Sequence, residues 1–171
     1  MDRSVFYQTI IERFNLTQVA IDILDQELYE ESLNKGEHIV EQGKRINDII
    51  FLVKGAVLSS FIREDKEYVT NISLEGEIIA IPLRESKISN ATLTALEDCV
   101  ILRISIDKFE SLMEKYPELS ILGYRIFKKL LGLVAEEYFD FTGLEAKEAY
   151  DKILRGRPEI INRIPLKVSI R

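Results

Sequence analysis

"KGEHIVEQGKRINDIIFLVKGAV", residues 35–57, indicates how this chain folds. Its short apolar runs end at Gly36, Gly43 and Gly55, and glycine is the residue that most easily adopts the positive φ of a chain reversal. Runs of the same kind recur at intervals of roughly 8–12 residues as far as residue 105, with Gly76 at the end of another. Such spacing is typical of antiparallel strands in a sandwich or barrel. The sequence therefore predicts a mostly β core.

Helical patterns flank these predicted strands. Apolar residues at helical spacing predict a helix from residue 3 to about residue 14, and Thr17 is suited to cap a second helix that ends near Leu24. After the strands, Asp107 and Glu110 have the spacing of a capping box for a short helix that Pro117 interrupts. We therefore expect helices at both ends of the β core.

A longer helix is predicted over residues 118–141, and it has two apolar stripes. The first stripe runs from Ser120 to Phe141 with alternating spacings of four and three residues. The second stripe lies about 110° around the helix from the first, and it contains Leu119, Leu122, Ile126, Leu130 and Leu133. One stripe is expected to pack on the β core and the other on the same helix of a second copy, which predicts a homodimer. The alternative is a helix buried in a groove of its own domain. The first stripe, spaced alternately by four and three residues, contains Ser120 and the predicted interface residues Tyr124, Phe127, Leu131, Val134, Tyr138 and Phe141.

Charge is distributed unevenly along the 171 residues. The net charge is −6, yet residues 143–171 contain seven Lys or Arg against four Asp or Glu. Thr142 and Glu145 have the spacing of a capping box for another helix in this basic segment. An acidic body with a basic end argues against a nucleic-acid surface over the whole chain, and we expect a further domain to begin here.

Composition excludes several classes of site. A single cysteine, Cys99, cannot form an internal disulfide or a four-cysteine zinc site, and a single histidine, His38, cannot supply a multi-histidine metal centre. The sequence shows neither a Ser/His/Asp set nor a glycine-rich phosphate loop, so we predict no catalytic residues, no bound metal and no enzyme activity. No apolar run approaches the ~18 residues of a membrane span, and no signal peptide is evident, so a cytoplasmic protein is expected.

The chain resembles the Crp/Fnr family of bacterial transcription regulators. The similarity is carried by residues 35–57, by "ALEDCVILRISIDKFESLMEKYPEL" (95–119) and by "LEAKEAYDKILRGRPEIINRIP" (144–165). It implies a double-stranded β-helix, or jelly roll, of the cyclic-nucleotide-binding type. Residues 1–117 would form this sensor domain, residues 118–141 a dimerisation helix, and residues 142–171 the start of a truncated winged helix-turn-helix that binds DNA.

The same resemblance places an effector pocket around residues 76–91. Members that bind cyclic nucleotides present Gly-Glu, matched here by Gly76 and Glu77, and later an Arg followed by Ser or Thr and Ala. Ser89 stands where that Arg is expected, and the interval is about two residues longer than in those members. Losing the cation beside a buried phosphate costs roughly 3–5 kcal/mol, so cyclic AMP is not expected as a cofactor. The remaining candidate pocket residues are Arg84, Lys87, Asn90 and Ala91.

Two functions therefore remain. The first is a dimeric DNA-binding regulator that senses an unknown effector, or none, in a degenerate pocket. The second is a stand-alone β-roll that recognises an effector or a protein without binding DNA. The sequence beyond residue 171 of the native gene distinguishes them.

Overall fold

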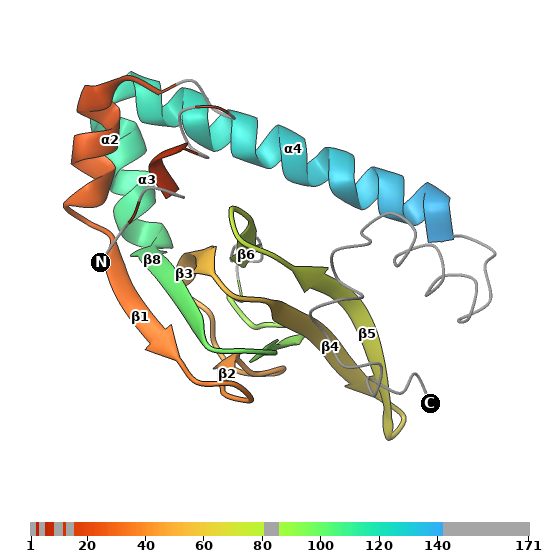
Figure 1. The fold of residues 1–171 in the computed structure, drawn as a ribbon. Coiled ribbons are helices and arrows are strands. Elements are labelled where there is room, and N and C mark those ends of the chain that lie inside the picture. The colour runs from red at the N-terminus through yellow and green to blue at the C-terminus, as the bar shows by residue number, and fades with distance from the viewer. Residues whose placement is uncertain (1–2, 4–5, 9–11, 13–15, 81–85, 142–171) are drawn as a thin grey trace. The chain divides into compact units, whose positions relative to one another are not determined.

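The computed structural model describes residues 3, 6–8, 12, 16–80 and 86–141, and beyond residue 128 it describes the side chains of residues 131 and 132 only. The chain divides into two compact units, Met1–Gly123 and Tyr124–Arg171. The first contains the β-roll drawn in Figure 1. The domain boundaries proposed from sequence, including the segment 142–171 that lies outside the described residues, stay a prediction.

Two four-stranded antiparallel sheets form the roll. One sheet has the order β1-β8-β3-β6 and the other β2-β7-β4-β5. This arrangement confirms the predicted mostly β fold with flanking helices. The strands are β1 (Tyr29–Leu33), β2 (His38–Val40), β3 (Asp48–Lys54), β4 (Val57–Arg63), β5 (Lys66–Ser73), β6 (Ile78–Ala80), β7 (Thr92–Ala95) and β8 (Cys99–Ser105).

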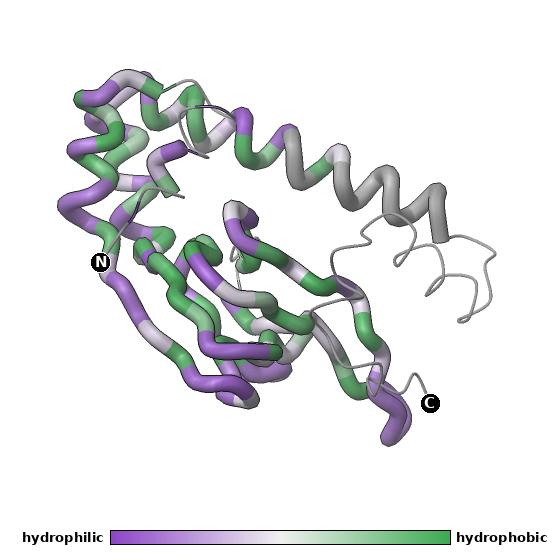
Figure 2. The backbone as a smooth tube through the Cα atoms, viewed as in Figure 1, coloured by the Kyte–Doolittle hydropathy of each residue, from purple (hydrophilic) through white to green (hydrophobic). Residues whose placement is uncertain are grey.

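Strand β3 lies at the centre of the hydrophobic core. Residues 50–53 of this strand are all buried, so both of its faces are covered, and Ile50 and Leu52 face the interior of the roll. Phe51 faces the opposite way and contacts Phe6 edge to face, with 5.1 Å between ring centroids. A continuous apolar run is what a strand covered on both faces requires. Figure 2 shows hydrophobic residues along β3 and β8 and hydrophilic residues at the tip of the β4–β5 hairpin.

Positive φ angles at glycine make the tight reversals of the roll possible. Gly36, Gly43, Gly55 and Gly76 have φ angles of 88°, 81°, 104° and 84°. Gly55 also lies against β8, because a Cβ atom built on it would be 2.5 Å from Sγ of Cys99. The turns predicted at these four glycines are confirmed.

Helices α2 (Gln18–Asp25), α3 (Ile106–Lys115) and α4 (Pro117–Phe141) flank the strands. Thr17 caps α2 as predicted. The cap of α3 is Ser105 and not Asp107, since the Ser105 hydroxyl accepts the Lys108 N–H. Asp107 lies instead in the first turn of this helix, where a negative charge favours the helix dipole.

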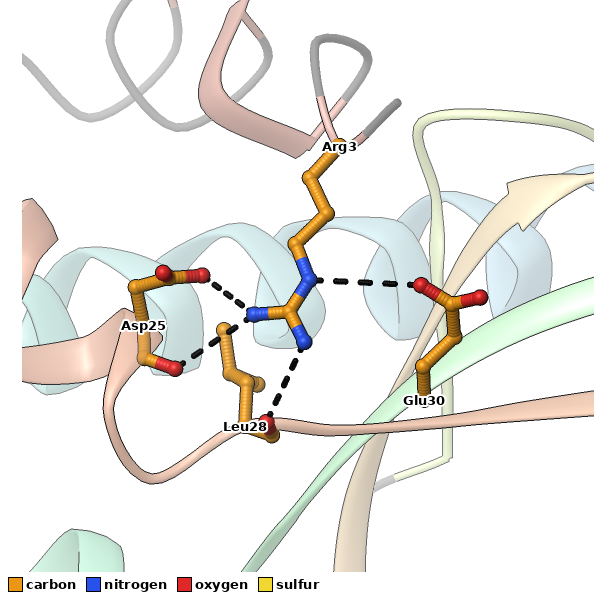
Figure 3. A network of polar contacts seen from close by, with 4 residues as sticks. All are labelled: Arg3, Asp25, Leu28 and Glu30. Atoms are coloured by element: carbon orange, nitrogen blue, oxygen red, sulfur yellow. Dashed lines mark hydrogen bonds and ion pairs between the residues drawn. The ribbon is translucent and has the colours of Figure 1, made fainter. Parts of the chain in front are cut away.

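Arg3 attaches the beginning of the chain to the region where α2 leads into β1. Its guanidinium pairs with the Asp25 carboxylate, donates to the Leu28 carbonyl at 3.4 Å and lies 4.0 Å from Glu30 (Figure 3). Farther along, the Glu118 carboxylate accepts both the N–H and the hydroxyl of Thr17, at 2.9 and 2.8 Å. These polar contacts join α2 to β1 and to the first turn of α4. No helix in the described part of the chain is long and apolar enough to cross a membrane.

Candidate effector pocket and dimer helix

Gly76 and Glu77 precede β6 and are joined to β3 through their backbones. The buried Gly76 donates its N–H to the Leu52 carbonyl at 2.9 Å, and the Leu52 N–H donates to the Glu77 carbonyl at 2.9 Å. The Gly76 N–H therefore takes part in a backbone hydrogen bond to β3. The half-buried Glu77 lies on the β6 side of the roll, whereas residues 89–91 lead into β7 of the other sheet.

We call residues 76–91, where the resemblance places the effector pocket, the cassette. In its described part Lys87 is the only Lys or Arg, because Arg84 lies outside the described residues. Its backbone has φ of 52°, and its ammonium lies 2.5 Å from the Asp107 carboxylate in the first turn of α3. The Lys87 side chain is 21% exposed. Because this ammonium already has a carboxylate partner, it is not an unpaired cation that a phosphate could bind.

Ser89 occupies the position expected for the phosphate-binding arginine. Its hydroxyl donates to the Ala91 carbonyl at 2.6 Å and accepts the Ala91 N–H at 3.3 Å, so the loop closes on itself. Asn90 is exposed and Ala91 is half-buried. Such a local serine turn satisfies backbone groups that a ligand would otherwise contact.

The cassette is also joined to the β2–β3 turn. Gly43 donates its N–H to the Ser89 carbonyl at 2.8 Å, and Ser89 donates its own to the Lys44 carbonyl at 2.9 Å. A third bond runs from the Ile46 N–H to the Lys87 carbonyl at 2.7 Å. These three bonds hold residues 87–89 against residues 43–46, two segments more than forty positions apart.

A network of ion pairs around the mostly buried Arg103 side chain was not predicted from sequence. The Arg103 side chain is 12% exposed, with Nε 2.5 Å from Glu31 and Nη1 3.6 Å from Asp48. Tyr29 donates its hydroxyl to Asp48 at 2.6 Å, and burial together with this bond raises the pKa of Tyr29 to about 12. An arginine in the middle of the apolar run "CVILRIS" was the available signal, because a cation in such a strand needs carboxylate partners.

Helix α4 shows the predicted difference between its two stripes wherever side chains are described. Leu119 and Leu122 are 0% and 1% exposed. By contrast, Tyr124, Phe127 and Leu131 are 64%, 53% and 58% exposed. The other predicted interface residues, Val134, Tyr138 and Phe141, lie in the helix, but their side chains are outside the described set.

Three kinds of comparison place this fold. Residues 30–116, just over half of the chain, match the family model of the cyclic nucleotide-binding domain, so the chain belongs to the cyclic nucleotide-binding domain family. No curated protein is similar enough in sequence to match the chain. Many solved structures share the fold.

The similar solved structures include transcription regulators. A transcriptional regulator from Thermotoga maritima has a TM-score of 0.61 and 22% identity, covering 72% of this chain and 98% of its own. A CooA variant from Carboxydothermus hydrogenoformans has a TM-score of 0.60 and 21% identity, over 81% and 90% of the two chains. DNR from Pseudomonas aeruginosa has a TM-score of 0.60 and 20% identity, covering 80% of this chain and 63% of its own. The resemblance noted from the sequence is therefore confirmed. The chain contains a cyclic nucleotide-binding domain, and its structural neighbours include Crp/Fnr-type regulators.

Proposed function

We propose that this chain is the sensor and dimerisation part of a Crp/Fnr-type transcription regulator that acts in the cytoplasm as a homodimer and is not an enzyme. DNA binding is assigned to the winged helix-turn-helix predicted to begin within residues 142–171. The effector, if there is one, is not cyclic AMP in its usual pose. The observation that carries this proposal is the exposed stripe of α4, on the helix that follows a cyclic nucleotide-binding domain.

Physical reasoning supports the dimer. Tyr124, Phe127 and Leu131 recur at intervals of three and four residues and are all more than half exposed. Fully covering a large apolar side chain gains about 1.5–3 kcal/mol. A second copy of the same helix, related by a two-fold axis, would cover the same stripe on both subunits.

Replacing Phe127 with Glu tests the dimer directly. We expect Phe127→Glu to convert a dimer into a folded monomer, measured by light scattering after size exclusion, with circular dichroism as the check on folding. Ile121→Glu is the matched control, because Ile121 is apolar and 50% exposed but lies off the stripe. The proposal is wrong if Phe127→Glu stays dimeric, or if both variants dissociate equally.

Cyclic AMP titration tests the pocket. A buried phosphodiester needs a cation and amide donors to replace its hydration, and the described cassette has a serine turn at position 89 and a lysine paired with Asp107. We expect no saturable heat in isothermal titration at about 1 mM cyclic AMP or cyclic GMP, which corresponds to an affinity weaker than about 4 kcal/mol. Saturable micromolar binding would contradict this part of the proposal.

The DNA-binding part has its own test. The intact mass of the native product, or the gene sequence past residue 171, will show whether a helix-turn-helix follows. A dimer that carries one is expected to bind paired half-sites about one helical turn apart, with affinity that falls steeply as salt rises. A stop codon directly after Arg171 would favour the stand-alone β-roll instead.

A further inference from the structure

A cleft of about 350 Å³ lies where β2 turns into β3, outside the cassette described above. Polar and charged side chains dominate its lining. Three are cations, two are carboxylates, and the other two are a histidine and an asparagine. These residues are Lys44, Arg45, Arg103, Glu41, Asp48, His38 and Asn47.

Arg103 forms a fixed part of the wall. Besides its ion pairs with Glu31 and Asp48, its guanidinium donates to the Ile39 carbonyl of β2 at 3.3 Å. This bond runs from one sheet of the roll to the other. Because two carboxylates already neutralise Arg103, it contributes shape and rigidity to the cleft, and the charge available to a ligand comes from elsewhere.

Lys44 and Arg45 supply that charge on the rim. Both side chains are exposed, and Arg45 uses its Nε–H to bind Asn47 at 3.0 Å, which is one of the five N–H donors of a guanidinium. The turn that bears them is held in place by backbone hydrogen bonds to residues 87–89. A backbone held in place lowers the entropy cost of binding an anion, and charge-assisted hydrogen bonds offset the cost of ordering the two long side chains.

We propose that this cleft binds a small oxyanion, a carboxylate or a phosphate, held by Lys44 and Arg45. The cleft has room for a molecule larger than inorganic phosphate, and apart from the paired Arg103 and Asp48 its lining has two cations and one carboxylate. An anion bound here lies on a turn joined by three hydrogen bonds to the cassette. The binding itself does not depend on the regulator function proposed above.

The test is an NMR titration of the 171-residue chain at constant ionic strength, with inorganic phosphate in one series and succinate in another. We expect saturable shifts of the backbone amides of residues 43–48. The double variant Lys44→Gln/Arg45→Gln should bind at least about tenfold more weakly, because charge-assisted hydrogen bonds are lost. Tighter binding in the first series identifies a phosphate ligand, and tighter binding in the second identifies a carboxylate.

Arg63→Gln/Lys66→Gln is the matched control, since it removes the same charge from exposed residues at the tip of the β4–β5 hairpin. Its affinity should equal that of the unaltered chain. The absence of saturable shifts up to about 10 mM of either anion, or equal weakening in both double variants, would overturn the proposal. Lys44→Gln alone provides a milder second variant if the double one melts early. The dimer and cyclic AMP experiments measure other properties of the chain, so an absence of anion binding in the cleft would not contradict their outcomes.

Discussion

The framework of the roll and its cassette are maintained in different ways. In the framework, Ile50, Leu52 and Ile101 are completely buried, and β3 is paired with β8 along its length. The second described part of the cassette, residues 86–91, is exposed or half-buried, and backbone hydrogen bonds to residues 43–46 hold it in place.

This difference explains how a domain can keep its fold while its ligand chemistry changes. Core stability is spread over many apolar side chains, each contributing about 1.5–3 kcal/mol on burial. Phosphate recognition, in contrast, depends on one or two charges at particular positions. A serine at a position where the family resemblance predicts such a charge leaves the apolar core untouched, so the fold does not depend on the predicted loss of cyclic nucleotide binding.

The largest expected effect is at a framework glycine. Gly55→Ala requires a Cβ atom at φ of 104°, 2.5 Å from Sγ of Cys99 and 3.0 Å from the Asp98 carbonyl. Strain at positive φ costs about 1–2 kcal/mol, and overpacking costs about 1–3 kcal/mol. We expect the free energy of unfolding, measured in urea, to fall by about 2–5 kcal/mol.

Gly36→Ala is the matched control for this substitution. Gly36 has φ of 88°, but a Cβ atom added to it would have no neighbouring atom within 4 Å. Only the backbone cost of about 1–2 kcal/mol is therefore expected. If both variants lose the same stability, close packing of Gly55 on Cys99 does not matter. Adding Cys99→Ala to Gly55→Ala should recover part of the loss, because neighbouring substitutions are not additive.

A pair of Ser→Ala substitutions compares the two regions at a smaller scale. Ser60 in β4 is 3% exposed and donates to the Glu67 carboxylate at 2.7 Å, whereas the Ser89 hydroxyl bonds within its own half-buried loop. Removing a buried hydrogen bond to a charged group costs about 1.5–3 kcal/mol, against about 0.5–1.5 kcal/mol for an ordinary one. We expect Ser60→Ala to destabilise the chain more than Ser89→Ala in urea unfolding. The reverse order would show that the cassette is as important to the fold as the framework.

Local features of the fold could be predicted from the sequence. Thr17 caps α2 and Gly36, Gly43, Gly55 and Gly76 form turns, because these roles depend on one residue and its near neighbours. The cap of α3 was misplaced by two residues. Strand β8 extends to Ser105, and the Ile106 N–H bonds to the Asn47 carbonyl at 2.8 Å, so a contact distant in sequence sets where the helix begins.

The sequence places the candidate pocket by resemblance, which stays a prediction, and it gives no information on the contacts that these residues make. The position of Ser89 followed from its spacing to Ala91 and to the Gly76–Glu77 pair. Its bonds to Gly43 and Lys44, and the pair between Lys87 and Asp107, join segments that only the folded chain brings together. Sequence periodicity contains no information on such pairings.

The smallest expected effect is a pH dependence in the framework. The pKa of Tyr29 is raised to about 12, first by burial and then by its bond to Asp48. The folded state therefore binds the phenol proton more tightly than the unfolded state, whose tyrosine has a pKa near 10. Stability from this group is fully present below about pH 10 and is lost as the pH rises toward about 12.

Tyr29→Phe isolates this contribution. Between about pH 10 and pH 12, the unaltered chain should lose more stability in urea unfolding than Tyr29→Phe does, because the variant has no phenol at this site. Tyr116→Phe, at another exposed tyrosine, is the control and should follow the unaltered chain. Parallel pH profiles for the unaltered chain and Tyr29→Phe would mean that the Tyr29–Asp48 bond is too exposed to matter, and that the framework is stabilised by its apolar core alone. A steeper loss in the unaltered chain would assign part of its stability to the polar network around Arg103.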